Sequence, residues 1–135
     1  MKKLLILTIA LMASMTISAQ TITETAKTKA AELVVKDEYD FILCYNANFD
    51  DVMHKKTPES VEALSEARFN YQTFCMFDSM IENLWKKHNT LVGFGMDHGC
   101  HAFINDEGEP RGTHRDNSPE DRNIVHLYKI HPAEE

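Results

Sequence analysis

The longest helical pattern of the chain covers residues 58–87. Apolar side chains recur in it at steps of three and four, namely Leu64, Ala67, Tyr71, Phe74, Phe77, Ile81, Leu84 and Trp85. This spacing places them on one face of a helix, and that face must pack against another element. Thr57 is suited to cap the helix, and Pro58 suits its first turn. We therefore predict a long amphipathic helix over residues 58–87.

Two short apolar runs flank this helix, at residues 41–45 and 90–95. The first run is too continuous to alternate, which is typical of a strand that is covered on both faces. The second run predicts a short strand that ends in a glycine. A strand, a helix and a second strand in this order make a right-handed parallel crossover. We expect an α/β fold with flanking helices, in which these strands belong to one small parallel or mixed sheet.

The remaining segments predict one more helix, one more strand and loops. Residues 21–37 have apolar residues at helical intervals, and residues 124–130 can close the sheet. The polar residues 46–56 are expected to form a loop. Residues 96–123 are polar and rich in Gly, Pro, Asp and His, and a long irregular stretch of this kind is usually functional.

Composition indicates one small globular domain. The chain has 135 residues, of which 43% are hydrophobic and 26% are charged. Its net charge is −7, with 14 Lys and Arg against 21 Asp and Glu. Binding to a nucleic-acid backbone needs clustered basic side chains, so this balance argues against a nucleic-acid partner.

Cysteine usage excludes a small fold that depends on disulfides. The three cysteines are an odd number, and none of them is in a C-x-x-C spacing. Cys44 lies in an apolar run and Cys75 lies on the predicted long helix. We predict that both are small buried hydrophobic residues.

Residues 1–19 have the order of a secretory signal peptide. Lys2 and Lys3 precede an apolar run at residues 4–12, and small or polar residues follow. The run is too short to span a bilayer. We expect cleavage after Ala19, which leaves residues 20–135 as an exported, periplasmic or secreted protein without a membrane span. The alternative interpretation is a buried N-terminal helix.

Acidic and histidine side chains follow both predicted strands. Asp50 and His54 come after the first strand, Asp97 and His98 come directly after the second, and His114 lies in the irregular stretch. The carboxyl ends of parallel strands share one crevice, so these side chains are expected to meet there. Imidazole nitrogen and carboxylate oxygen are good ligands for zinc and similar divalent ions. The alternatives are that Asp50 caps a helix or lies in a solvated loop, and that His98 is a turn residue bonded to the backbone.

Five motifs occur in a fixed order: Asp50-Asp51-Val52-Met53-His54, Pro58-Glu59-Ser60, Thr90-Leu91-Val92, Asp97-His98-Gly99 and Gly112-Thr113-His114. Over roughly residues 38–130 this order resembles the C-terminal part of the alkaline phosphatase superfamily, especially its type I phosphodiesterase and nucleotide pyrophosphatase branch. The resemblance implies a partial alkaline-phosphatase-like domain, metal-dependent chemistry on a phosphoester, and two zinc or related ions in one crevice. It implies that Asp50, His54 and His114 hold one ion, and that Asp97 and His98 help to hold the other.

The chain departs from that family in three places. The family also uses an aspartate and a Ser or Thr nucleophile, both from a substantial N-terminal region, whereas residues 20–37 here are predicted to be a helix. We therefore assign no catalytic residue. Thr57 stands where Gly often precedes the Pro, and Arg115 follows His114 where Gly is common. A position that needs a positive φ tolerates Gly far better than Arg.

The leading hypothesis is an exported, metal-binding remnant of a phosphodiesterase-like hydrolase. A second hypothesis is a phosphoester hydrolase that works only with a partner chain supplying the missing groups. A third is a periplasmic metal-binding or interaction module without turnover. A fourth is an incomplete gene product, in which an open apolar sheet edge leads to self-association.

Overall fold

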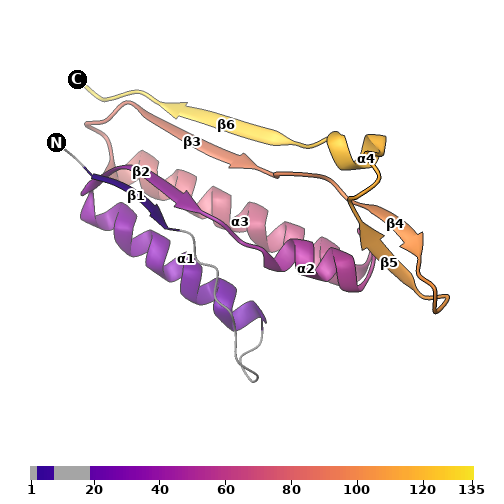
Figure 1. Ribbon diagram of the computed structural model, residues 1–135. Coiled ribbons are helices and arrows are strands. Elements are labelled where there is room, and N and C mark those ends of the chain that lie inside the picture. The colour runs from indigo at the N-terminus through magenta and orange to yellow at the C-terminus, as the bar shows by residue number, and fades with distance from the viewer. Residues whose placement is uncertain (1–2, 8–18) are drawn as a thin grey trace.

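The computed structural model describes residues 3–7 and 19–135, with side chains from Glu24 onward. The helices are α1 (Ala19–Lys36), α2 (Asn48–Lys55), α3 (Val61–Leu84) and α4 (Pro119–Arg122). The strands are β1 (Lys3–Leu7), β2 (Tyr39–Cys44), β3 (Thr90–Gly95), β4 (His101–Ile104), β5 (Pro110–Thr113) and β6 (His126–His131) (Figure 1). The fold is mixed α/β. In the described part of the chain, no helix is both long and apolar enough to cross a membrane.

The strands form three separate two-stranded sheets. β1 pairs with β2 in parallel, whereas β3 pairs with β6 and β4 pairs with β5 in antiparallel fashion. The expected crossover, with β2 and β3 in one sheet, is therefore wrong for the described residues. β3 instead takes its backbone partner from the C-terminal strand, in register from Thr90 opposite His131 to Gly95 opposite His126.

The two long helices confirm the helical periodicity. α3 begins three residues later than predicted, because Ser60 rather than Thr57 is its N-cap; the Ser60 hydroxyl accepts a hydrogen bond of 3.1 Å from the amide of Ala63. At the other end of α3, the Trp85 indole donates to the carbonyl of Val34 on α1 over 2.8 Å. This bond ties the two helices together.

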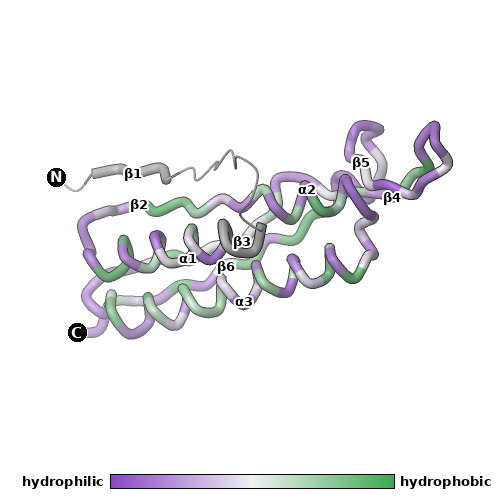
Figure 2. Tube along the Cα trace, turned by 90° about the horizontal axis from the view of Figure 1, so that it is seen from below, coloured by the Kyte–Doolittle hydropathy of each residue, from purple (hydrophilic) through white to green (hydrophobic). Residues whose placement is uncertain are grey.

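The described core is small. Its buried apolar side chains come mainly from α1, with Ala26, Ala30, Leu33 and Val34, and are completed by Met53, Ala63 and Ile81. Figure 2 shows hydrophobic residues along β2 and along the paired strands β3 and β6 as well. Many of these strand residues are exposed, so the sheets present apolar surface that the described chain does not cover.

The cysteine prediction is wrong, because Cys44 and Cys75 are both exposed. Cys75 lies 12 residues after the buried Ala63, which is about 120° around α3 from the face that Ala63 and Ile81 share. Cys44 lies at the end of β2, where Phe41, Leu43 and Tyr45 are exposed too. Helical or apolar patterning therefore does not by itself imply that a cysteine is buried.

Two segments that were expected to be irregular contain regular structure. Residues 46–56 hold helix α2, which buries Met53 and has Asp50 and Asp51 in its first turn, where acidic groups suit the helix dipole. Residues 96–123 hold the β4–β5 hairpin and the short helix α4. The turn of the hairpin contains Gly108 at a φ of +78°, and glycine adopts that value without strain.

Candidate metal centre

Helix α2 places the first two candidate ligands on one face. Asp50 and His54 are four residues apart, and residues at this spacing are neighbours on a helix surface. The His54 Nε2 atom lies 3.4 Å from the Asp50 Oδ1 atom. The predicted pair is thus brought together, although by a helix and not by the expected loop.

Two further imidazoles reach the same carboxylate oxygen from other elements. His98, after β3, places its Nε2 atom 3.7 Å from Asp50 Oδ1, and His114, after β5, places its Nε2 atom 3.9 Å from it. The rings of His98 and His114 stack with their centroids 3.8 Å apart. Three histidines from three segments therefore converge on one oxygen of Asp50.

Backbone carbonyls orient two of these rings. The Nδ1 atom of His54 lies 2.9 Å from the carbonyl oxygen of Gly112, and the Nδ1 atom of His98 lies 2.9 Å from that of Gly99. A carbonyl only accepts, so each Nδ1 carries the proton and donates it. In the neutral ring the Nε2 lone pair is then free, and it faces Asp50. Metal-binding histidines are typically held in this way.

The Asp50 Oδ1 atom is buried and has no hydrogen-bond partner among the described residues. A buried carboxylate oxygen without a donor costs folding free energy, and a cation removes that cost. Asp50, His54 and His114 form a group whose ligand atoms all lie within 4.8 Å of one another. The donor set and the orphaned oxygen together fit a divalent cation.

Asp97 lies at the edge of this group. Its Oδ1 atom is 3.8 Å from His98 Nε2, but its side chain is 63% exposed and it does not belong to the three-ligand group. The described residues bring no third His, Cys, Asp or Glu ligand to Asp97 and His98 to complete a second site. The two ligand sets that the resemblance implies therefore differ. The three ligands Asp50, His54 and His114 lie together, whereas Asp97 and His98 have no third ligand among the described residues.

Gly112 and Gly99, which belong to the sequence motifs, lie where two segments of the backbone approach closely. A Cβ atom on Gly112 would lie 2.3 Å from the carbonyl oxygen of Met53, and one on Gly99 would lie 1.8 Å from that of Glu120. Neither contact is tolerable, so only glycine lets β5 reach α2 and lets the loop after β3 reach α4. Arg115 does not have a positive φ; on this loop the positive φ belongs to Asn117, at 58°.

Sequence reasoning did not place His101 with Asp121 and Ser118, which form a second polar cluster. His101 Nδ1 lies 2.8 Å from Asp121 Oδ1 and 3.2 Å from the Ser118 hydroxyl. The hydrogen bond with Asp121 raises the pKa of His101. Both partners meet the same ring nitrogen, whereas a Ser-His-Asp triad uses opposite nitrogens. The sequence signal for this cluster was Ser118-x-x-Asp121, the capping box of α4.

Nearby acidic side chains make the potential at the centre negative. Burial, followed by the charges of Asp50, Asp121 and Glu59, raises the pKa of the Cys100 thiol to about 11. Burial, together with the charges of Asp97, Asp50 and Asp51, also raises the pKa of Tyr45. Both groups therefore stay neutral, and the excess negative charge favours a cation over an anion.

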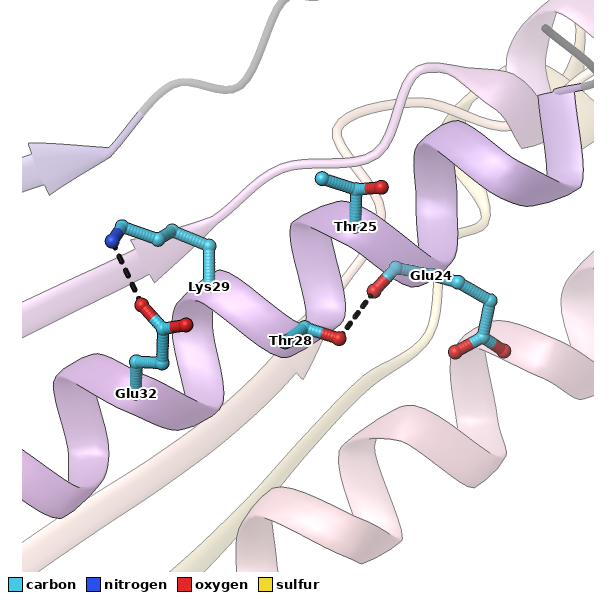
Figure 3. Close-up of a pocket in the computed structure, with 5 residues that line it drawn as sticks. All are labelled: Glu24, Thr25, Thr28, Lys29 and Glu32. Atoms are coloured by element: carbon cyan, nitrogen blue, oxygen red, sulfur yellow. Dashed lines mark hydrogen bonds and ion pairs between the residues drawn. The ribbon is translucent and has the colours of Figure 1, made fainter.

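A shallow depression on α1 offers no comparable chemistry. Figure 3 shows its lining, which consists of Glu24, Thr25, Thr28, Lys29 and Glu32. The Thr28 hydroxyl donates to the carbonyl of Glu24, and Lys29 pairs with Glu32 over 2.8 Å. These contacts are ordinary interactions along the surface of one helix.

Comparison with protein families, with curated proteins and with solved structures gives no match for this chain.

Proposed function

We propose that this chain is an exported metal-binding module that holds one zinc-like divalent ion through Asp50, His54 and His114. The observation that carries the proposal is the buried Asp50 Oδ1 atom, which lacks a hydrogen-bond donor and faces imidazole nitrogens. The order of its motifs supports a relationship to the C-terminal half of phosphodiesterase-type hydrolases.

The spacing of the ligand atoms suits tetrahedral coordination. Zinc bonds to nitrogen and oxygen of about 2.0–2.1 Å imply separations of roughly 3.3 Å between ligand atoms in a tetrahedron. The distances of 3.4 Å and 3.9 Å from Asp50 Oδ1 to His54 Nε2 and His114 Nε2 need only small side-chain rotations to reach this value. Three protein ligands leave a fourth position for water, for His98 or for a phosphoester oxygen.

An ion in this position polarises a bound phosphoryl oxygen, but turnover by the family route also needs a nucleophile and a second metal site. Asp97 and His98 supply only part of that second site. We therefore infer that the chain binds metal and hydrolyses phosphodiesters poorly or not at all by itself.

A second candidate function is a phosphoester hydrolase completed by a partner chain. The observation that favours it is the exposed Asp97 carboxylate beside His98, which is open to ligands from outside the chain. Robust hydrolysis of a chromogenic phosphodiester by the isolated, zinc-loaded chain would contradict both candidates, because no partner would then be needed.

Calorimetric titration of the purified chain with zinc tests the main proposal. We expect a stoichiometry of about one, and His54→Ala and His114→Ala should each weaken binding at least about 100-fold. His88→Ala is the matched control, because His88 pairs with Asp37 at 2.9 Å and does not belong to the three-ligand group. Unchanged affinity in both His54→Ala and His114→Ala would show that the ion binds elsewhere.

A further inference from the structure

Asp121 is the buried charged side chain of the described part of the chain, with only 7% of its surface exposed. It lies on α4, a helix of four residues. A single helical turn is not stable by itself, so the position of α4 must come from contacts with other segments. Figure 1 shows α4 beside the point where the segment after β3 enters β4. A buried carboxylate at this point needs hydrogen-bond partners.

The Asp121 carboxylate joins α4 to β4 and also closes the first turn of its own helix. Its Oδ1 atom lies 2.8 Å from the Nδ1 atom of His101, the first residue of β4. Its Oδ2 atom accepts a hydrogen bond of 3.3 Å from the Ser118 amide, and the Ser118 hydroxyl accepts one of 3.2 Å from the Asp121 amide. Both oxygens of Asp121 therefore hold segments of the chain together, whereas the Asp50 Oδ1 atom has no such partner.

The backbone of α4 continues this series of contacts to His98. The Gly99 amide donates a hydrogen bond of 2.8 Å to the Asp121 carbonyl. The Gly99 carbonyl accepts one of 2.9 Å from the Nδ1 atom of His98, which orients that ring. The same ring stacks on His114 and places its Nε2 atom 3.7 Å from Asp50 Oδ1. Asp121 is thus connected to the metal centre through Gly99.

We propose that Asp121 is a positioning residue that holds the His98 ring at the metal centre, where His98 acts as the fourth ligand of the ion. The inference rests on the proposed function and goes beyond it, because it selects His98 among the groups that could fill the fourth position. An ion with four protein ligands has no open position for water or for a phosphoester oxygen. Closed zinc sites of this kind are structural, so this centre binds metal without turnover.

A double-mutant cycle on zinc affinity tests the positioning role. Asp121→Ala should weaken zinc binding about tenfold, as His98→Ala should, because both changes take the same ligand from the ion. In the His98→Ala chain, the further change Asp121→Ala should alter the affinity by less than about twofold. A similar loss in both backgrounds would mean that Asp121 acts only on the general stability of the chain, and would overturn the proposal.

Two further variants separate positioning from loss of stability. Trp85→Phe removes the indole hydrogen bond to the Val34 carbonyl at the C-terminal end of α3, so it should lower stability but change zinc affinity by less than about twofold. His101→Ala removes a partner of the Asp121 carboxylate and keeps the Ser118 cap of α4. It should weaken zinc binding at least about threefold. This variant keeps the proposal testable if the Asp121→Ala chain does not fold, and an unchanged zinc affinity would contradict it.

A measurement without metal distinguishes this inference from the proposed function. At a pH where histidine is neutral, nitrogen NMR of the metal-free parent should show the His98 ring proton fixed on Nδ1, which faces the Gly99 carbonyl. In Asp121→Ala this preference should be lost. If it is lost in a chain whose parent does not bind zinc, positioning by Asp121 is supported and the proposed function fails. Zinc binding by the parent, with an unchanged His98 signal in Asp121→Ala, would overturn the positioning role alone.

Discussion

His98 lies between two acidic side chains, and under the proposed function its position bears on how many ions the centre would hold. Its Nε2 atom is 3.7 Å from Asp50 Oδ1 and 3.8 Å from Asp97 Oδ1, and its ring stacks on His114. The resemblance pairs His98 with Asp97 in a second site. In the structure, the His98 Nε2 atom is as close to Asp50 as to Asp97, so His98 could instead complete the coordination of the ion proposed to bind at Asp50.

We predict that His98→Ala weakens zinc binding at the first site by about tenfold or more, whereas Asp97→Ala changes it less than about threefold. The reason is that His98 lies beside Asp50, while the Asp97 side chain is 63% exposed. Calorimetric titration of both variants measures the difference. A larger loss in Asp97→Ala than in His98→Ala would show that the ion binds on the Asp97 side.

The sequence motifs predicted that Asp50, His54 and His114 lie close together, because these candidate ligands are themselves part of the motifs. The cluster of His101, Asp121 and Ser118 was not predicted, since its contacts join β4 to the N-terminus of α4 and depend on how the loop after β3 folds back. Long-range contacts of this kind leave little trace in local spacing.

The His101–Asp121 pair predicts a pH dependence of stability. The hydrogen bond with Asp121 raises the pKa of His101 in the folded chain. The stabilisation from this bond is therefore complete below the pKa of histidine in the unfolded chain, about 6.5, and it is lost as the pH rises through the pKa of folded His101. Burial raises the pKa of Asp121, but the hydrogen bonds from His101 and Ser118 outweigh it and lower the pKa overall. The carboxylate contribution is therefore present above about pH 3.9 and is lost as pH falls through the folded pKa.

Asp121→Asn should lower the pKa of His101 and flatten the fall in stability above about pH 6.5. NMR titration of the imidazole signals and urea unfolding at several pH values measure both effects. The His88→Ala chain is a useful control, because its His101 should titrate as in the parent. An unchanged His101 titration in Asp121→Asn would contradict the assignment.

For helix α3, the local sequence pattern was sufficient to predict the helix but not to predict the residue that caps it. The periodicity of residues 58–87 predicted the helix, because a buried face repeats every three or four residues along it. The pattern did not distinguish Thr57 from Ser60 as the cap, since both residue types are suitable. Only the backbone decides this, and Ser60 has the extended φ and ψ of −64° and 153° that an N-cap needs.

Ser60→Ala should therefore lower the free energy of unfolding by about 1 kcal/mol, because the amide of Ala63 loses its acceptor. Thr57→Ala is the matched control and should change it by less than about 0.5 kcal/mol. Urea unfolding of the two variants beside the parent makes the comparison. A greater loss in Thr57→Ala would mean that α3 begins at Pro58 after all.

Strand pairing was harder to predict than the helices, because a strand does not specify its neighbour. The apolar runs at residues 41–45 and 90–95 do contain strands, but the assumption that they share a sheet was wrong for the described residues. β3 pairs with β6, whose Lys129 and His131 side chains bond to Asp78 of α3 at 2.8 Å and 2.6 Å. These polar contacts hold β6 against the helix, and no sequence periodicity indicated them. Helix α2 was missed because its residues are mostly polar and only Met53 is buried.

At the scale of the whole molecule, the described chain has more apolar surface than its helices cover. The β3–β6 sheet has two different faces. Phe94 points toward α3, where its ring lies 5.7 Å from that of Phe74. Leu91 and Ile130 are directly opposite each other on the other face, and they are 63% and 73% exposed. Contiguous exposed apolar residues on a sheet typically mark an interface or lead to self-association.

We predict that the purified chain self-associates through this outer face, and that Leu91→Thr combined with Ile130→Thr reduces the association. Threonine keeps the preference for strands but adds a hydroxyl to a surface that would otherwise bury carbon. Both side chains are exposed in the single chain, so its unfolding free energy should change by less than about 0.5 kcal/mol per site. Sedimentation velocity over a concentration series should show the double variant as a monomer at concentrations at least tenfold higher than those at which the parent associates.

Val92→Thr, on the inner face and only half-exposed, is the matched control: it should cost about 1 kcal/mol or more of stability and leave association unchanged. If the double variant associates like the parent, the contact surface lies elsewhere on the molecule.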